Sequence, residues 1–345
     1  MNSKYFKQFV EDRNLKPKTV DGYKVSINSY CRFNKMSVDE LMNEALLDEK
    51  NRVLLKDRVI KKRLLSYRSF LIKRGMSHNT VKTYFSKIKT FYNHFSIELP
   101  KLPSVKYSKS YQLNYSDLPS RDDIAEVLNI VPLDFKALIL FMSSSGTAKA
   151  ETLSLTVGDF ITACSDYYEA TALESILNEL NNRNDVVPTL YLRRIKTDKY
   201  YFTFCSSEAS SYIVRYLKSR SNLSLEDKLF PFTSTLITTK FQKINDYMNW
   251  GRRGYYRFFR SHVLRKFHAS NIGLAAEYVD SLQGRQKNLV HDAYIKSNPD
   301  MLKQLYVDHM NNVMIFSSSV STQKVVEEIH VSINIFLSDM YISLD

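Results

Sequence analysis

Residues 143–160 read SSSGTAKAETLSLTVGDF, and this stretch is the most informative one in the chain. A mostly apolar run, Leu133 to Met142, precedes it and predicts a buried helix. After that helix the chain turns at Gly146, and the small residue Ala148 suits the start of the next helix. The stretch therefore predicts a tight turn between two helices, directly next to a hydrophobic core.

Two β-rich runs follow the turn in the sequence. Residues 189–195 and 199–204 are rich in aromatic, aliphatic and threonine side chains, and Lys196-Thr-Asp separates them. This arrangement predicts a β-hairpin that carries Lys196 at its turn. Helical patterns return from Ser210 onward.

Two further patterns lie near the C-terminal end of the same region. Residues 262–270 read HVLRKFHAS and place His262 three residues before Arg265. Residues 282–285 read LQGR, and Tyr294 follows Arg285 by nine residues. Each pattern is common when taken alone, so the information lies in their order and spacing.

Together these patterns resemble the tyrosine recombinases, the family of phage-type integrases. Its members carry an Arg in a Gly-x-Arg-x-x-Glu turn, a Lys on a β-hairpin and a His-x-x-Arg pair. A Leu-Gly-His/Trp turn follows, with a Tyr about nine residues later. The resemblance spans roughly residues 120–300, and it implies a mixed α/β catalytic domain that cuts and rejoins DNA.

The resemblance also implies a role for each matching residue. Breaking a phosphodiester without a metal needs fixed cations around oxygens that gain charge in the transition state. Arg265 would clamp the non-bridging oxygens, since a guanidinium binds two of them at once. Lys196 would protonate the leaving 5′ oxygen, and His262 would assist proton transfer. Tyr294 would attack and form a 3′-phosphotyrosine, so that neither ATP, a metal nor another cofactor is needed.

The sequence departs from the family pattern at two positions. Arg285 stands where the family usually has His or Trp, a variant reminiscent of archaeal and archaeal-virus members that can still donate hydrogen bonds to a phosphate. Ala148 occupies the slot of the first catalytic arginine, with Lys149 one position away. This loss predicts impaired catalysis, with three interpretations open: an engineered knockout, a natural defect in a protein that only binds DNA, or a substitute cation at Lys149.

The positive charge of the chain is concentrated in its first third. The 345 residues carry 49 Lys and Arg against 36 Asp and Glu, a net charge of +13. Residues 1–110 hold 24 of the basic residues and 10 of the acidic ones, so the rest of the chain is close to neutral. A basic surface of this kind suits a polyanion, because binding releases counterions from phosphates.

The first third also has the pattern of a helical bundle. A Thr-Val-x-x-Tyr signature at residues 19–23 returns at residues 80–84, and in both places we expect the threonine to open a helix. Residues 99–119 contain three prolines and no period, which predicts a linker. The expected fold is therefore mainly α with a small antiparallel sheet: a helical, SAM-like core-binding domain at 1–98, the linker, and a catalytic domain at 120–300. The resemblance implies that the two domains form a C-shaped clamp on duplex DNA.

A second set of basic residues precedes His262. Residues 249–260 alternate aromatic side chains with Arg252, Arg253 and two further arginines, and we expect Phe258 or Phe259 to be buried while the first two arginines contact phosphates. The full set of predicted DNA-binding residues is Lys61, Lys62, Arg63, Arg68, Lys82, Lys87, Arg252 and Arg253.

Residues 301–345 form a C-terminal tail with helical patterns. In the family, segments near the nucleophile pass to a neighbouring protomer, so the tail either packs on a partner subunit or folds back on its own domain. The resemblance implies a homo-oligomer, a tetramer on two DNA sites, and a double-stranded target with an inverted-repeat core.

The composition restricts the kinds of metal and disulfide sites and the cellular compartment that we expect. The three cysteines are far apart, which argues against a disulfide framework and a Cys-rich zinc site. No signal peptide or run of about 18 apolar residues is present, so we expect a cytoplasmic protein of a prokaryotic or viral host cell, without a membrane partner. Two other functions stay open: a catalytically silent sequence-specific DNA-binding or architectural protein, and a related type IB topoisomerase or telomere resolvase.

Overall fold

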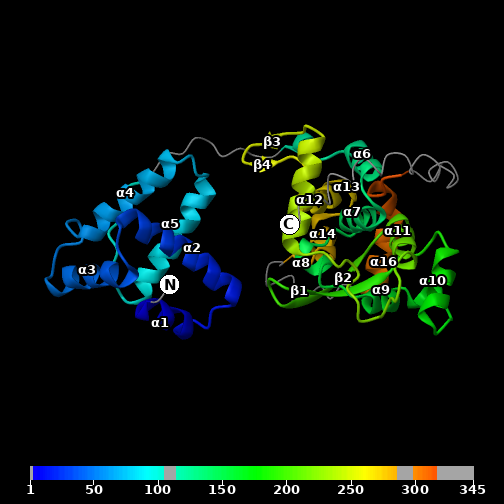
Figure 1. Ribbon diagram of the computed structural model, residues 1–345, viewed down its shortest axis with the longest axis horizontal. Coiled ribbons are helices and arrows are strands. Elements are labelled where there is room, and N and C mark those ends of the chain that lie inside the picture. Colours follow the sequence, from blue (N-terminus) through cyan, green and yellow to red (C-terminus); the bar gives the residue numbers. More distant parts are fainter. Residues whose placement is uncertain (1–2, 105–113, 286–297, 317–345) are drawn as a thin grey trace. The chain divides into compact units, whose positions relative to one another are not determined.

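The computed structural model describes residues 3–104, 114–285 and 298–316. The chain divides into two compact units, Met1–Gln112 and Leu113–Asp345. The first is helical, and the second combines helices with two short antiparallel hairpins (Figure 1). This composition confirms the expected fold class of helices with a small antiparallel sheet.

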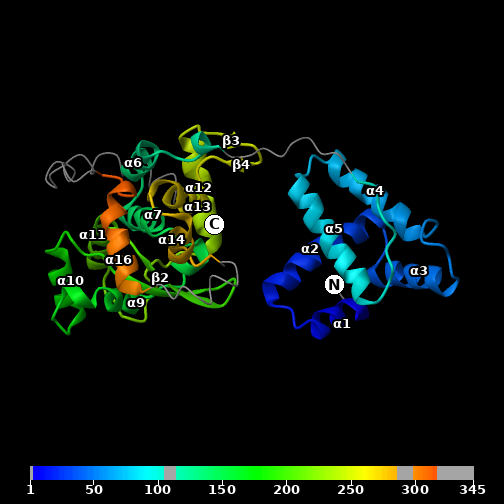
Figure 2. The same ribbon diagram turned by 180° about the vertical axis from the view of Figure 1, so that it is seen from behind.

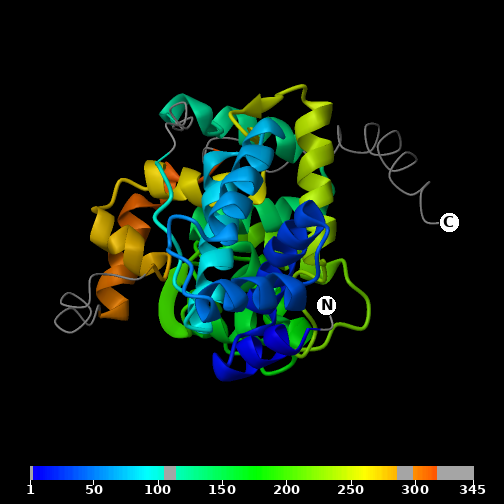
Figure 3. The same ribbon diagram turned by 90° about the vertical axis from the view of Figure 1, so that its left-hand side faces the viewer.

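Five helices build the described part of the first unit, and Figure 3 shows them crossing one another in blue and cyan. Their apolar faces, rich in Tyr and Phe, form a separate core in which Phe9, Leu64 and Tyr67 are fully buried. The helices are α1 (Lys4–Asp12), α2 (Pro17–Asn34), α3 (Val38–Lys50), α4 (Val59–Lys73) and α5 (His78–His94).

Two helix starts in this unit differ from the prediction. The helix α2 begins at Pro17, because proline has no backbone N–H to lose at the first helical position. Ser77 caps α5 by accepting a hydrogen bond from the Thr80 backbone N–H at 3.2 Å. Thr19 and Thr80 therefore lie inside the first turns of their helices and do not cap them.

The second unit is arranged around the apolar helix α7 (Leu133–Ser145), as the sequence predicts. α11 (Ser207–Lys218) and α13 (Ser261–Asn271) pack against it (Figure 1). Ser120 forms a capping box at the start of α6 (Arg121–Ile130). The remaining helices are α8 (Lys149–Thr152), α9 (Val157–Ala163), α10 (Leu173–Asn181), α12 (Ser234–Tyr247), α14 (Ala276–Leu282) and α16 (Pro299–His309), with 3-10 turns at Tyr115–Asp117, Ser165–Tyr167 and Met310–Asn312.

The hairpin that the sequence predicts within residues 189–204 is present, and a second, shorter hairpin that was not predicted lies within residues 249–260. β1 (Thr189–Arg194) pairs antiparallel with β2 (Lys199–Phe204), with Leu192 opposite Tyr201. β3 (Arg252–Arg253) pairs with β4 (Tyr256–Arg257). Along β1 the side chains alternate between a buried and an exposed face, so residues two apart share a face.

The described part of the C-terminal tail packs on its own unit. Tyr306 of α16 is fully buried, stacks near Phe204 of β2, and donates a hydrogen bond to the Ser144 carbonyl at 2.9 Å. Figure 2 shows α16 in orange beside the rest of this unit. Residues 301–316 thus fold back, which is one of the two alternatives for the tail, and residues 317–345 lie outside the described residues.

Candidate active site

The turn at Gly146 is held in one conformation by its neighbours. Gly146 ends α7 with φ of 64°, a left-handed conformation that favours glycine. A Cβ atom at this position would lie 2.6 Å from His268 Nδ1 and 2.7 Å from Gln283 Nε2. The backbone of the turn therefore rests directly on two buried polar side chains.

The guanidinium of Arg265 lies beneath this turn. Arg265 Nη1 donates to the Gly146 carbonyl at 2.7 Å, across 119 residues of sequence, and Nη2 donates to the Gln283 carbonyl at 2.6 Å. Its side chain is only 5% exposed. Burial, followed by the positive charges of Arg194 and Arg285, lowers its pKa to about 10, so it is protonated at neutral pH.

Arg265 has no carboxylate within ion-pair distance among residues 3–104, 114–285 and 298–316. A buried cation normally has an anionic partner, because moving an uncompensated charge out of water is costly. The arrangement therefore suits an external anion that reaches the guanidinium from solvent.

A second layer of polar side chains fixes Arg265 in place. Gln283 Nε2 donates both to the Arg265 carbonyl at 3.0 Å and to His268 Nδ1 at 2.9 Å. His268 is fully buried, and burial with the nearby charges of Arg265 and Arg285 lowers its pKa to about 3. It is therefore neutral at physiological pH and acts as a hydrogen-bond acceptor that orients Gln283.

His262 and Arg285 approach the same place from two helix ends. His262 lies in the first turn of α13, where partial burial and the charges of Lys266, Arg260, Arg265 and Arg285 lower its pKa. Arg285 follows α14, is exposed, and lies 3.3 Å from Asp280 Oδ1. The charges of Arg265 and Arg285 thus lie close enough to His262 to lower its pKa, and Arg265 itself contacts the turn at Gly146.

The first-arginine slot holds no cation, as the sequence indicates. Ala148 is the N-cap of α8 and is partly exposed. Lys149 points toward α12, where its Nζ donates to the Ser234 carbonyl at 3.1 Å and to Thr238 Oγ1 at 2.9 Å. These contacts argue against Lys149 as the substitute cation.

Lys196 is exposed in the turn between β1 and β2, as predicted. Tyr294, the predicted nucleophile, lies outside the described residues. No group of three or more His, Cys, Asp or Glu side chains that could hold a metal ion occurs in the described part of the chain.

Comparison with known proteins gives a match at the level of the fold. No protein-family model and no curated protein matches this sequence. Among solved structures, lambda integrase residues 75–356 bound to DNA has a TM-score of 0.51 at 11% identity, over 92% of this chain and 98% of that one. The lambda integrase tetramer bound to a Holliday junction has a TM-score of 0.51 at 14% identity, over 84% of this chain and 74% of that one.

The chain has the lambda integrase fold. This likeness confirms the resemblance to the phage-type integrases at the level of structure. The XerH recombinase bound to its difH substrate is also similar, with a TM-score of 0.45 at 13% identity, over 92% of this chain and 80% of that one.

Sequence reasoning missed one residue of this integrase-fold site. Arg194, the last residue of β1, lies with Nη1 3.6 Å from Glu151 Oε1 and 3.4 Å from the Gln283 carbonyl. Its signal was the alternation along the strand, since Leu190 and Leu192 on the same face are buried. From the sequence alone, Arg194 cannot be distinguished from an ordinary strand arginine, because its contact with Glu151 arises only in the folded structure.

The predicted DNA-binding residues of the first unit differ in their surroundings. Lys62 and Lys82 are exposed. Arg63 is bound on both sides, by the Glu44 carboxylate and by Asn34 Oδ1 at 3.1 Å, so its charge is largely compensated within the bundle. The others make weaker local contacts: Lys61 with the Lys56 carbonyl, Arg68 with the Pro103 carbonyl, and Lys87 over the Tyr23 ring.

The β3–β4 hairpin places Arg252 on the surface. Its Nη1 donates to the Tyr255 carbonyl at 3.2 Å, while Arg253 lies over the Phe258 ring and 3.7 Å from Asp117. Phe258 and Phe259 are both buried, where one buried ring was expected, and Arg252 is exposed while Arg253 is partly buried.

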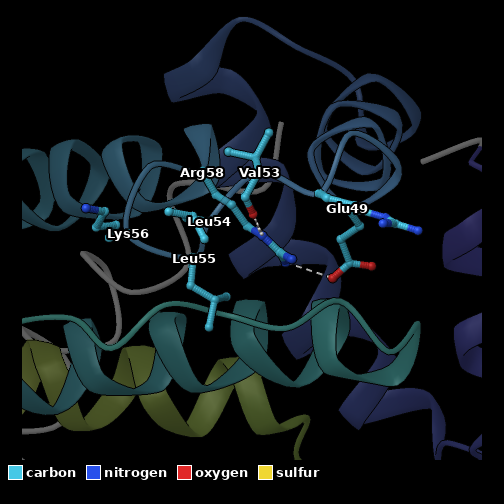
Figure 4. Close-up of a pocket in the computed structure, with 7 residues that line it drawn as sticks. Glu49, Val53, Leu54, Leu55, Lys56 and Arg58 are labelled. Atoms are coloured by element: carbon cyan, nitrogen blue, oxygen red, sulfur yellow. Dashed lines mark hydrogen bonds and ion pairs between the residues drawn. The ribbon is translucent and has the colours of Figure 1, made fainter.

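An open surface pocket of the first unit involves none of the residues of this site. It is lined by residues 49–58 between α3 and α4, and Arg58 crosses it to donate to the Val53 carbonyl and to Glu49 Oε1 at 2.8 Å (Figure 4). Of the cations that line it, Arg58 is already paired with the Glu49 carboxylate. We find no helix in the described residues that is both long and apolar enough to cross a membrane.

Proposed function

We propose that this chain is a site-specific DNA recombinase that cuts and rejoins duplex DNA through a 3′-phosphotyrosine at Tyr294. The observation that carries the proposal is the buried guanidinium of Arg265, which has no carboxylate within ion-pair distance in the described residues and is close to the charges of Arg194 and Arg285. The integrase fold and the basic first third of the chain support DNA as the source of the anion.

The proposed chemistry follows from the role that the resemblance implies for each group. The two non-bridging oxygens of the scissile phosphate bind Arg265, with Arg285 as a further hydrogen-bond donor. The Tyr294 phenol attacks phosphorus and loses its proton, while the bond to the 5′ oxygen breaks and Lys196 protonates that oxygen. His262 suits a role in proton transfer, because its lowered pKa leaves the ring neutral and able to accept a proton near pH 7.

Rejoining reverses these steps with a different strand. The 5′ hydroxyl of a second strand attacks the phosphotyrosine, the new phosphodiester forms, and Tyr294 regains its proton. The bond energy is retained in the covalent intermediate, so the exchange needs no nucleotide hydrolysis. We further propose that four protomers assemble on two inverted-repeat sites to bring such strands together.

The test is covalent capture of DNA. Binding sites are first selected from a random duplex library, and the best site is then synthesised with a nick next to the cut position so that the cleaved end diffuses away. We expect a protein–DNA adduct that survives denaturation, maps to Tyr294, and disappears in Tyr294→Phe while DNA binding is retained. An unchanged adduct in Tyr294→Phe would reject the proposal.

A catalytically silent DNA-binding protein is the second candidate, favoured by the missing guanidinium at Ala148. This candidate predicts site-specific binding and no adduct, and an adduct in Ala148→Arg alone would indicate an active ancestor. Relaxation of any supercoiled plasmid, without a preferred site, would instead identify a type IB topoisomerase.

A further inference from the structure

The turn at residues 146–151 retains the glutamate of the family pattern but lacks its arginine. Glu151 is 3% exposed and stands at the acidic position of the Gly-x-Arg-x-x-Glu pattern, while Ala148 stands at the arginine position. One carboxylate oxygen, Glu151 Oε2, has no hydrogen-bond partner in the described part of the protein. A buried carboxylate is expected to have a cationic partner nearby.

That partner comes from a different element. Arg194 Nη1 lies 3.6 Å from Glu151 Oε1, and the Arg194 side chain is only 15% exposed although arginine is mostly a surface residue. The strand explains this position, because Arg194 continues the inward face formed by Leu190 and Leu192. Its neighbour Arg193 points outward, with a 59% exposed side chain that pairs with Asp198.

Arg194 is also adjacent to the guanidinium of Arg265. The Gln283 carbonyl accepts a hydrogen bond from Arg265 Nη2 at 2.6 Å and lies 3.4 Å from Arg194 Nη1. The two cations therefore share one backbone oxygen, and the buried Glu151 carboxylate lies beside Arg194 and close enough to Arg265 to affect its pKa. Two guanidiniums beside a single carboxylate leave a net positive charge for an anion to balance.

We propose that Arg194 supplies the second guanidinium of the phosphate site and replaces the arginine that the turn lacks at Ala148. Arg194 and Arg265 together bind the non-bridging oxygens of the scissile phosphate, and Glu151 holds Arg194 in place. The inference rests on the proposed recombinase function. It makes Ala148 a native feature of a working site, in which the guanidinium comes from the end of β1.

The first experiment measures anion binding without any chemistry. In the Tyr294→Phe background, thermal unfolding is followed as inorganic phosphate is added at constant ionic strength. Phosphate is expected to raise the melting temperature of this protein and of its Arg193→Gln derivative, and to have a much smaller effect on its Arg194→Gln derivative. Equal stabilisation of all three would overturn the proposal, because Arg193 is the matched arginine on the opposite face of the strand.

The second experiment measures cleavage of the nicked substrate. Arg194→Lys keeps the charge and removes the fork that binds two oxygens, so we expect adduct formation to slow by roughly 100-fold or more. Arg193→Lys should leave the rate unchanged. Adding Ala148→Arg to the Arg194→Gln variant should restore the adduct, a rescue that a merely misfolded variant would not show.

The two proposals fail in different ways. Adduct formation by Arg194→Lys at the parental rate, in a parent that is active, would remove Arg194 from the site and leave the recombinase assignment intact. Absence of any adduct in the parent, together with phosphate stabilisation that depends on Arg194, would reject the recombinase and retain the anion site.

Discussion

At the scale of single residues, Gly146 is the position where backbone and site depend most directly on each other. Its φ of 64° favours glycine, and its Cα faces His268 and Gln283 without room for a methyl group. Since the Gly146 carbonyl also accepts a hydrogen bond from Arg265, a shift of this turn would move the guanidinium.

We therefore predict that Gly146→Ala lowers the free energy of unfolding by about 3 kcal/mol, from the left-handed backbone together with overpacking. Gly251→Ala is the matched control, because Gly251 has φ of 62° and open space around its Cα. That variant should lose only about 1 kcal/mol. Denaturant titration measures both, and equal losses would show that the contact with His268 and Gln283 carries no energy.

The buried His268 gives the protein a specific sensitivity to acid. Its folded-state pKa of about 3 lies below the ordinary value of 6.5, so between these values the unfolded chain binds a proton that the folded chain does not. Stability is expected to fall as the pH decreases through this range, by about 1.4 kcal/mol per pH unit from this residue.

His268→Asn tests this prediction, since asparagine keeps a hydrogen-bond acceptor for Gln283 and does not titrate. We expect the stability of the variant, measured by denaturant titration from pH 4.5 to 7.5, to depend less steeply on pH below 6.5 than that of the parent. Parallel pH profiles would contradict the assignment, whatever the offset between them.

Some residues of the candidate site can be predicted from sequence motifs, whereas others depend on contacts that form only in the folded protein. Arg265 and His262 could be named as candidates because they stand three residues apart in a recognisable order, and the fold places Arg265 against the Gly146 carbonyl. Arg194 could not, because its role depends on a contact with Glu151 that arises from packing of the hairpin against α8. Gln283 belongs to the Leu-Gln-Gly-Arg motif, yet only the folded structure shows that it hydrogen-bonds to both Arg265 and His268.

At the scale of elements, the strongest local signals predicted structure well. The apolar run before Gly146 became α7, and the two β-rich runs became β1 and β2 with only the Ile195 position reassigned to the turn. Helix starts were less predictable in the first unit, because Pro17 takes the first helical position of α2 and Ser77 caps α5, so that the nearby threonines lie inside the helices.

The β3–β4 hairpin is the element whose proposed role can be tested most simply. We predict that Arg252→Ala and Arg253→Ala each reduce the slope of log binding constant against log salt by about one, because each removes one phosphate contact. Fluorescence anisotropy with the selected duplex at several salt concentrations measures the slope. Arg183→Ala is the control, since Arg183 pairs with Asp185 beyond α10 and has no proposed contact with DNA. A slope that matches the control would remove the hairpin from the interface.

At the scale of the whole molecule, charge and core packing are divided between the two units. The first third carries the entire excess of positive charge, whereas the second unit is close to neutral and buries the guanidinium of Arg265 at an internal site. The first unit therefore suits sequence-independent attraction to phosphates, and the second suits chemistry at a single phosphate. Each unit has its own hydrophobic core, so each function rests on an independently packed structure.

The described part of the C-terminal region packs on the second unit. Leu302, Tyr306 and Val313 are buried in the core of the second unit. The Glu208 carboxylate accepts hydrogen bonds from the backbone N–H groups of Ile315 and Phe316 at 2.9 and 2.7 Å. Residues up to 316 are therefore part of the domain, whatever residues 317–345 do.

We predict that a chain ending at Phe316 stays soluble and binds a single DNA site with unchanged affinity, but no longer pairs two sites. A chain ending at Asn298 should be insoluble, because it exposes the surface that α16 covers. Gel-shift titration distinguishes single-site binding from pairing, and sedimentation reports the assembly. If the 316-residue chain pairs two sites as well as the full chain does, the remaining residues have no part in subunit exchange; if it precipitates, they belong to the same core as α16.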